Sequence, residues 1–134
     1  MMSQYTYLEI LERNEQLISK LVQLGYQKPI TDNLTLIRNH TSDPNVLASK
    51  FVEFGLVNYD KKEAIMRNSR SESDQAEQLF MTAIKHGDWK KVIDALVKTK
   101  NDYIIKELHA YVNKYPEPSH ENQRTDEINV QVSL

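Results

Sequence analysis

Several residue types that would define a fold or a site are scarce in this sequence. Its 134 residues include no cysteine, three glycines and four prolines. Without cysteine there can be no disulfide, no cysteine-ligated zinc or iron–sulfur cluster and no thiol nucleophile. The absence of cysteine also fits a reducing compartment such as the cytosol. The scarcity of glycine and proline favours helices over a turn-rich β fold, so the expected class is all-α.

Long apolar runs and a strong net charge are also missing. No stretch approaches the ~18 apolar residues of a membrane-spanning helix. Residues 1–16 are acidic where a secretory signal would start with basic residues. The formal net charge of −2 differs from the basic balance of most nucleic-acid-binding domains. We therefore expect a cytoplasmic protein without membrane contact, for which a nucleic acid is a poor candidate partner.

Motifs for catalysis, cofactors and metals are absent as well. The serines at 69–73 lack the Gly-x-Ser-x-Gly setting of a nucleophile and could instead accept phosphate. No glycine-rich loop could hold a nucleotide phosphate. No two histidines have the three- or four-residue spacing that places two metal ligands on one helical face: His40, His86, His109 and His120. We expect no enzymatic activity, no small-molecule substrate, no cofactor and no metal.

The sequence does contain repeated amphipathic periodicity. Apolar residues at three- and four-residue steps predict one helix over 4–24 and six more after residue 28. Prolines open two of the six, because proline has no amide hydrogen to leave unpaired in the first helical turn. The expected helix starts after residue 28 are Pro29, Pro44 after an Asp43 cap, Asp60, Asp74, Trp89 after an Asp88 cap, and Asn101 or Asp102.

Each predicted helix has a recognisable inner face and end. Gly25, Gly55 and Gly87 are expected to end three of them. Asp60 with Glu63 has the spacing of a capping box. The expected inner residues are Leu8, Leu11, Ile18, Leu21, Val22, Ile30, Leu34, Ile37, Leu47, Ala48, Phe51, Val52, Phe54, Ala64, Ile65, Ala76, Leu79, Phe80, Ala83, Ile84, Trp89, Val92, Ile93, Leu96, Val97, Ile104, Ile105, Leu108, Tyr111 and Val112.

Two long segments resemble the caspase recruitment domain, a member of the death-fold superfamily. The segment ITDNLTLIRNHTSDPNVLASKFVEFGLVNYDKKEAIM resembles its first three helices, and AEQLFMTAIKHGDWKKVIDALVKTKNDYIIKELHAYV resembles its last three. The Gly87-Asp88-Trp89 start of a helix and its ALVKTKN end resemble most closely the domains of antiviral RNA-sensing helicase receptors and their mitochondrial adaptor. The resemblance covers about residues 28–115.

This resemblance implies a six-helix antiparallel death-fold bundle with an additional N-terminal helix. The expected organisation is an amphipathic helix in 1–27, a caspase recruitment-like domain in 28–116 and a flexible acidic tail in 117–134. The implied function is that of a non-catalytic adaptor in innate immune or cell-death signalling. Its implied partners are other caspase recruitment domain proteins or further copies of the chain, assembled into an oligomer or filament.

In such domains partners dock through faces of opposite charge, and contacts that do not close on themselves propagate into filaments. On this chain the candidate acidic face consists of Glu53, Asp60 and Glu63. The candidate basic face consists of Arg38, Lys85, Lys90 and Lys91. The competing interpretation is that these are ordinary solvated charges.

Further alternatives stay open. The helix at 4–24 could be a seventh helix of the bundle, or the true first helix with 28–40 as an insertion. It could also cover a docking face, so that the chain acts as a decoy that blocks assembly. A helix-turn-helix between residues 44 and 68 would instead make a nucleic-acid-binding regulator, supported only by Lys61, Lys62, Arg67 and Arg70. Trp89 is expected in the core, with an exposed binding role as the alternative.

Overall fold

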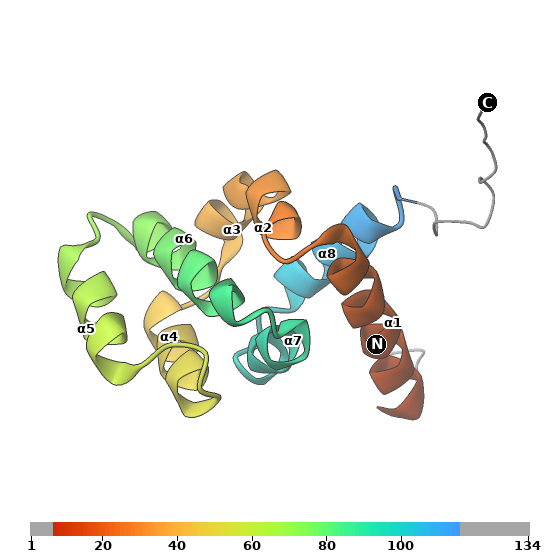
Figure 1. The fold of residues 1–134 in the computed structure, drawn as a ribbon, viewed down its shortest axis with the longest axis horizontal. Coiled ribbons are helices and arrows are strands. Elements are labelled where there is room, and N and C mark those ends of the chain that lie inside the picture. Colours follow the sequence, from red (N-terminus) through yellow and green to blue (C-terminus); the bar gives the residue numbers. More distant parts are fainter. Residues whose placement is uncertain (1–6, 116–134) are drawn as a thin grey trace, which may run out of the picture.

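The fold is seen in a computed structural model that describes residues 7–115, with side chains from residue 12 onward (Figure 1). Every regular element in this range is a helix, which confirms the all-α class. The elements are α1 (Tyr7–Leu24), α2 (Lys28–Asp32), α3 (Leu34–His40), α4 (Pro44–Glu53), α5 (Tyr59–Asn68), α6 (Glu72–Ala83), the 3₁₀ turn η1 (Ile84–His86), α7 (Trp89–Lys98) and α8 (Asp102–Val112). The predicted tail at 117–134 lies outside the described residues.

The predicted helix opened by Pro29 is two helices, so the expected count of six after residue 28 is wrong. The chain leaves helical geometry at Asn33, with φ −116° and ψ 26°. The Asn33 side-chain amide donates to the Pro29 carbonyl at 2.8 Å, and its backbone N–H bonds the Ile30 carbonyl at 3.2 Å. Asparagine side chains compete in this way with the helical hydrogen-bond ladder. The short helix α2 therefore ends there and α3 begins in a new direction.

The start of α5 differs from the predicted capping box. Asn58, not Asp60, is the cap: its side-chain oxygen accepts a hydrogen bond from the Lys61 amide at 2.7 Å. Asp60 lies within the first turn, where a carboxylate still interacts favourably with the positive end of the helix dipole.

The start of α6 also precedes its predicted position. Ser71 caps the helix by accepting a hydrogen bond from the Asp74 amide at 3.1 Å. The Asp74 carboxylate in turn accepts from the Arg70 amide at 3.3 Å. The two side chains satisfy backbone donors on both sides of the cap, which extends the helix by one half-turn toward its N-terminus. The predicted caps Asp43 and Asp88 are confirmed.

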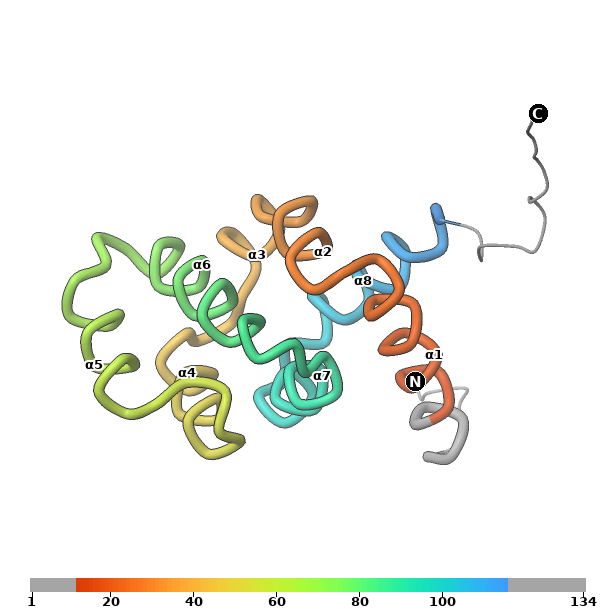
Figure 2. The backbone as a smooth tube through the Cα atoms, in the orientation of Figure 1, coloured from red at the N-terminus to blue at the C-terminus, as the bar shows by residue number. Residues whose placement is uncertain are grey.

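The helices form one bundle, elongated along the axis that is horizontal in Figure 1. Its centre is formed by α3 against α6 and α8, α4 against α6 and α7, and α7 against α8. The helix α5 packs on α4 and α6 at one end, whereas α1 packs on α7 and α8 at the other (Figures 1 and 2). The two peripheral helices therefore pack mainly on different helices of the bundle.

The predicted inner faces of α6 and α8 are confirmed residue by residue. Phe51 of α4 and Phe80 of α6 meet edge to face, with ring centroids 5.8 Å apart. Trp89 is fully buried, as expected of a core residue. The predicted stripes are too wide at two points, because Val22 and Val97 are 45% and 44% exposed at the edges of their helices.

The helix α1 is an integral part of the bundle. Leu17 and Leu21 are buried in the same core cluster as the residues of α4, α6, α7 and α8. A seventh helix of the bundle and a true first helix would both bury these residues, so the choice between the two alternatives stays a prediction. The predicted inner residues Leu8 and Leu11 lie outside the described side chains.

One buried polar side chain joins two turns of the fold. Asn101 accepts a hydrogen bond from the Ser42 amide at 2.6 Å and donates to the Thr99 hydroxyl at 2.8 Å. It was predicted as a helix cap, but its side chain makes no capping bond. It instead connects the turn before α8 to the turn before α4. Both turns contain a left-handed residue, Lys100 and Asp43.

Candidate protein-binding surface

The three predicted acidic residues lie on α4 and α5, at the end of the bundle remote from α1 (Figure 1). Glu53 pairs with Lys50, with 2.9 Å between Oε1 and Nζ, and Glu63 pairs with Lys62 at 3.3 Å. Asp60 is exposed and makes no ion pair with any described residue. Since lysines offset the other two charges, Asp60 is the uncompensated acid of this set.

Three of the four predicted basic residues lie at the junction of η1 and α7. Lys90 and Lys91 are in the first turn of α7 and pair with Asp94 and Asp88 at 3.3 and 4.0 Å. These pairs are solvent-exposed, and such pairs typically contribute less than about 1 kcal/mol. Lys85 in η1 is exposed and has no ion-pair partner within residues 12–115. It is therefore the uncompensated cation of this set.

The fourth predicted basic residue, Arg38, takes part in an internal network. Its guanidinium on α3 reaches across to α6, where it contacts the Asp74 carboxylate at 3.0 Å and also pairs with Glu77. The hydrogen bond from Arg38 is the main cause of a lowered pKa at Asp74, and the two carboxylates raise the pKa of Arg38. Arg38 is separate from the other three basic residues, and both of its partners belong to the same bundle.

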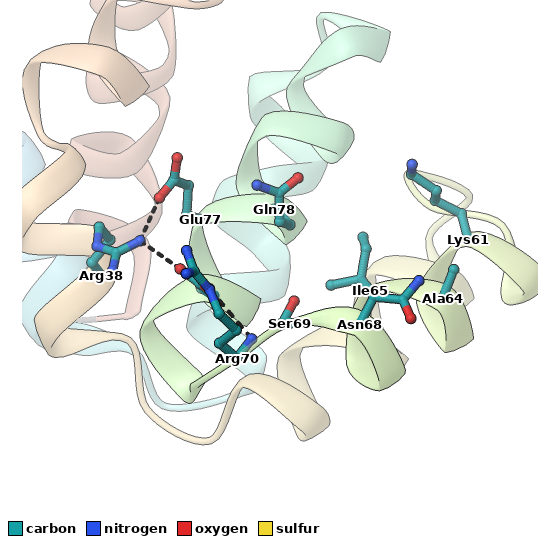
Figure 3. A pocket seen from close by; sticks show the side chains of 10 residues that line it. Arg38, Lys61, Ala64, Ile65, Asn68, Ser69, Arg70, Glu77 and Gln78 are labelled. Carbon is teal, nitrogen blue, oxygen red and sulfur yellow. Dashed lines mark hydrogen bonds and ion pairs between the residues drawn. The ribbon is translucent and has the colours of Figure 1, made fainter.

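A groove of about 580 Å³ lies beside this network, between α3, α5 and α6 (Figure 3). Lys61 and Asn68 of α5 line one side, and Glu77 and Gln78 of α6 face them across the groove. Arg38 closes the α3 side. Charges of both signs and side-chain amides dominate the lining, which suits a polar partner surface better than an apolar ligand. Sequence reasoning missed the groove, because it depends on how α5 packs against α6.

A second polar cluster joins α2 to α8. The Tyr111 hydroxyl donates to the Asp32 carboxylate at 2.6 Å, and Lys28 pairs with the same carboxylate at 3.0 Å. The hydrogen bond from Tyr111, followed by that from Lys28, lowers the pKa of Asp32. Burial, followed by the bond to Asp32, raises the pKa of Tyr111. The tyrosine therefore stays protonated and fixes α2 on α8.

The other aromatic residues divide between core and surface. Tyr103 is about half exposed, although its ring lies 4.9 Å from that of His40. Tyr115 is partly exposed beside Tyr111, with ring centroids 5.2 Å apart. Tyr59 at the start of α5 is the most exposed large apolar side chain in the described range. It lies next to Asp60, and sequence reasoning did not single it out.

The three histidines in the described range lie apart from one another. In the part of the chain that the structure describes, no group of three His, Asp or Glu side chains could hold a metal ion. His109 of α8 is half-buried against α1, with Nε2 3.4 Å from the Asn14 side-chain oxygen. His40 and His86 are exposed on other elements.

Comparisons of the chain with protein-family models, with curated protein sequences and with solved structures each find no match. Within residues 7–115, no helix has the length and apolar character needed to cross a bilayer. Function is therefore inferred from the chain's own residues.

Proposed function

We propose that this chain is a non-catalytic protein–protein interaction module of the caspase recruitment type, which assembles through surfaces of opposite charge. In this proposal α2 and α3 together form the first helix of a death-fold bundle, and α4 to α8 form the second to sixth. The helix α1 is an addition to that bundle. The expected partners are further copies of the chain or other caspase recruitment domains, in cytoplasmic innate immune or cell-death signalling.

The observation that carries the proposal is the separation of two uncompensated charges. Asp60 on α5 and Lys85 in η1 are both exposed, have opposite signs and make no ion pair with any described residue. They belong to elements at different places along the bundle. A contact between Asp60 of one copy and Lys85 of the next would leave one charge free at each end. Such a head-to-tail contact can propagate.

The surroundings of the two charges favour a contact of this kind. Exposed Tyr59 lies beside Asp60 and could supply apolar area, which a charge pair alone lacks. Lys90 and Lys91 follow Lys85 and extend the positive surface, and their weak exposed pairs can be exchanged for a partner's carboxylates. Charge complementarity of this type sets orientation and partner choice more than affinity.

The test measures molar mass by light scattering over a concentration series, for the wild type and for Asp60→Asn, Lys85→Gln and Lys98→Gln. Lys98 is an exposed lysine on the last turn of α7 and controls for the loss of one positive charge. We expect wild-type oligomers that weaken with added salt, because the contacting charges are screened. Asp60→Asn and Lys85→Gln should each reduce the oligomer, whereas Lys98→Gln should not.

A charge exchange sharpens the same test. Asp60→Lys and Lys85→Glu should each abolish assembly alone, and the double variant should restore it if the two residues meet directly. Circular dichroism must show an intact fold, because a lysine in the first turn of α5 opposes the helix dipole. A wild type that stays monomeric at every concentration and salt contradicts self-assembly. Equal effects of all three neutral variants contradict the assignment of the two surfaces.

A regulatory decoy is the second candidate, favoured by the position of the segment after α1. The Tyr26 ring lies directly over Gly87, which separates Lys85 from Lys90 and Lys91. Tyr26 thus lies over the backbone between the lysines of the proposed basic surface. Deletion of α1 is a poor test, because it would remove Leu17 and Leu21 from the core. Tyr26→Ala removes only the aromatic ring that lies over Gly87. Stronger assembly of that variant would support the decoy, and unchanged assembly would contradict it.

A further inference from the structure

The cleft between α1 and α8 is lined by positive or neutral side chains. It measures about 80 Å³, and its described lining contains no carboxylate. Arg13, Gln16 and Lys20 contribute from α1, and His109 and Asn113 contribute from α8. Two larger clefts differ, since the α3–α5–α6 groove and the cleft around Tyr111 each include acidic side chains. This cleft is therefore a local site of positive potential in a chain of net charge −2.

We propose that this cleft binds one tetrahedral oxyanion of the phosphate class, either as the free ion or as the phosphate group of a small molecule. Lys20 and Arg13 would supply positive charge from α1, and the His109 imidazole would donate from α8. Gln16 and Asn113 carry amide groups that can donate to the remaining oxygens. This proposal is independent of assembly, because none of these residues belongs to the charged surfaces above.

The spacing of the α1 residues explains why they converge. Residues 13, 16, 17 and 20 follow the three- and four-residue steps that place side chains on one face of a helix. Leu17 of this set is buried against the bundle, so its neighbours lie at the edge of the α1–α8 contact. Lys20 makes no ion pair with a described residue. Arg13 is already engaged in another contact, and Nε2 of His109 lies 3.4 Å from the Asn14 side-chain oxygen. The uncommitted donor is therefore Lys20.

The size of the cleft limits the ligand. It holds a few water molecules, or one group of four oxygens around a central atom, but not a nucleotide base and sugar as well. Arg13, Gln16 and Asn113 are exposed, so the cleft opens to solvent and a small substituent on the phosphate could extend outward. Guanidinium and ammonium groups form their strongest hydrogen bonds with anionic oxygens of this kind.

The pKa of His109 reflects the positive side chains beside it. Burial, followed by the charges of Arg13 and Lys20, lowers the pKa of its imidazole. These two α1 side chains are the charged groups that act on it; none comes from α3 or α7, which also pack against α8. A bound dianion would reverse the electrostatic effect of the two cations. It would raise the pKa of His109 and join α1 to α8.

The first test uses inorganic sulfate, which remains a dianion throughout the range over which histidine titrates. Proton NMR follows all four histidines from pH 5 to 8, with sulfate or with chloride at equal ionic strength. We expect sulfate to raise the titration midpoint of His109 and to leave those of His40, His86 and His120 in place. Equal shifts at all four histidines, or none at His109, would overturn the proposal.

The second test compares variants by the rise in thermal midpoint with sulfate and with inorganic phosphate. Lys20→Gln should weaken sulfate binding at least tenfold, whereas Lys61→Gln, which removes one exposed lysine at the α5 end, should not change it. His109→Gln should remove the tightening of sulfate binding at low pH. Lys20→Gln relieves repulsion, so the variant should fold without ligand. Equal loss in the two lysine variants would overturn the proposal.

Glycerol 3-phosphate distinguishes the two sources of the ligand. Affinity equal to that of inorganic phosphate would show that the site takes a phosphate group on a small carrier. Binding of inorganic phosphate alone would show that the cleft holds the free ion. Both results support an oxyanion site. Failure of sulfate, phosphate and glycerol 3-phosphate alike to saturate in the millimolar range would overturn it.

Discussion

The helices α5 and α7 have the same length and opposite roles. Each contains ten residues and starts with an Asx side chain that caps the third helical amide. The helix α7 packs against α1, α4 and α8 and buries Trp89, Val92, Ile93, Ala95 and Leu96, whereas α5 buries only Ile65. The fold depends on α7, while α5 is free to present polar groups. Substitutions in the two helices should therefore separate stability from binding.

Truncation of a core side chain should give the largest difference in stability between the two helices. Leu96→Ala in α7 leaves a cavity among fully buried neighbours and should lower the free energy of unfolding by about 2–5 kcal/mol. Ile65→Ala in α5 should cost less, at the low end of that range, because the residue borders the open groove. Urea unfolding at constant slope measures both costs. Equal costs would contradict the peripheral role of α5.

The entry to α7 should be the next most sensitive point. Gly87 has a left-handed φ of +66°, and an added Cβ would lie 3.0 Å from the Tyr26 ring. Gly87→Ala should cost about 1–2 kcal/mol, because alanine is strained in this conformation. The double variant Gly87→Ala/Tyr26→Ala removes the clash and keeps the strain, so it should recover only part of the loss. Full recovery would show that backbone strain contributes nothing.

Removal of the capping side chain should lower the free energy of unfolding by about 1 kcal/mol for either helix. The resulting loss of hydrogen-exchange protection should extend over different parts of the chain in the two cases. Asn58→Ala should reduce hydrogen-exchange protection in α5 alone, because a peripheral helix can open without the bundle. Asp88→Ala should reduce the protection of every core amide, because α7 cannot open separately. Native-state exchange measured by NMR distinguishes the two patterns. A global loss of protection in Asn58→Ala would refute this distinction.

The smallest effect on stability should come from the ion pair between Arg38 of α3 and Asp74 of α6, which borders the groove beside α5. Arg38 lowers the pKa of Asp74 in the folded state. The unfolded state therefore binds more protons near pH 4, and this source of stability is lost as the pH falls through the folded pKa. Arg38→Met should destabilise the protein at pH 6, and its difference from wild type should shrink by pH 3. Urea midpoints at the two pH values measure this. A difference independent of pH would show that Arg38 acts through packing.

Periodicity in the sequence predicted the inner faces of α6, α7 and α8 well, because long apolar stripes leave one way to face a core. It failed where a single polar side chain determines the residue at which a helix begins or ends. Asn33 divides α2 from α3, and Asn58 and Ser71 move the starts of α5 and α6, since each side chain satisfies a backbone group that the apolar pattern does not register.

The candidate sites were less predictable than the helices. The sequence marked Asp60 and Lys85 as charged, but not as the members of their groups without a partner. The sequence predicted Arg38 to be a surface cation. Only the packing of α3 against α6 shows that two carboxylates engage it. The cleft between α1 and α8 was not predicted, because Lys20 and His109 are far apart in the chain.

The sequence by itself determined an all-helical chain, the confirmed caps at Asp43 and Asp88, and most of the residues that the bundle buries. These features depend on local propensity, hydrogen bonding within a turn and helical spacing. Only the tertiary structure decided that α1 joins the core, which charges neutralise one another and where positive side chains gather without an acid. Ion pairs and clefts form between segments distant in sequence, and their positions follow from how the helices pack.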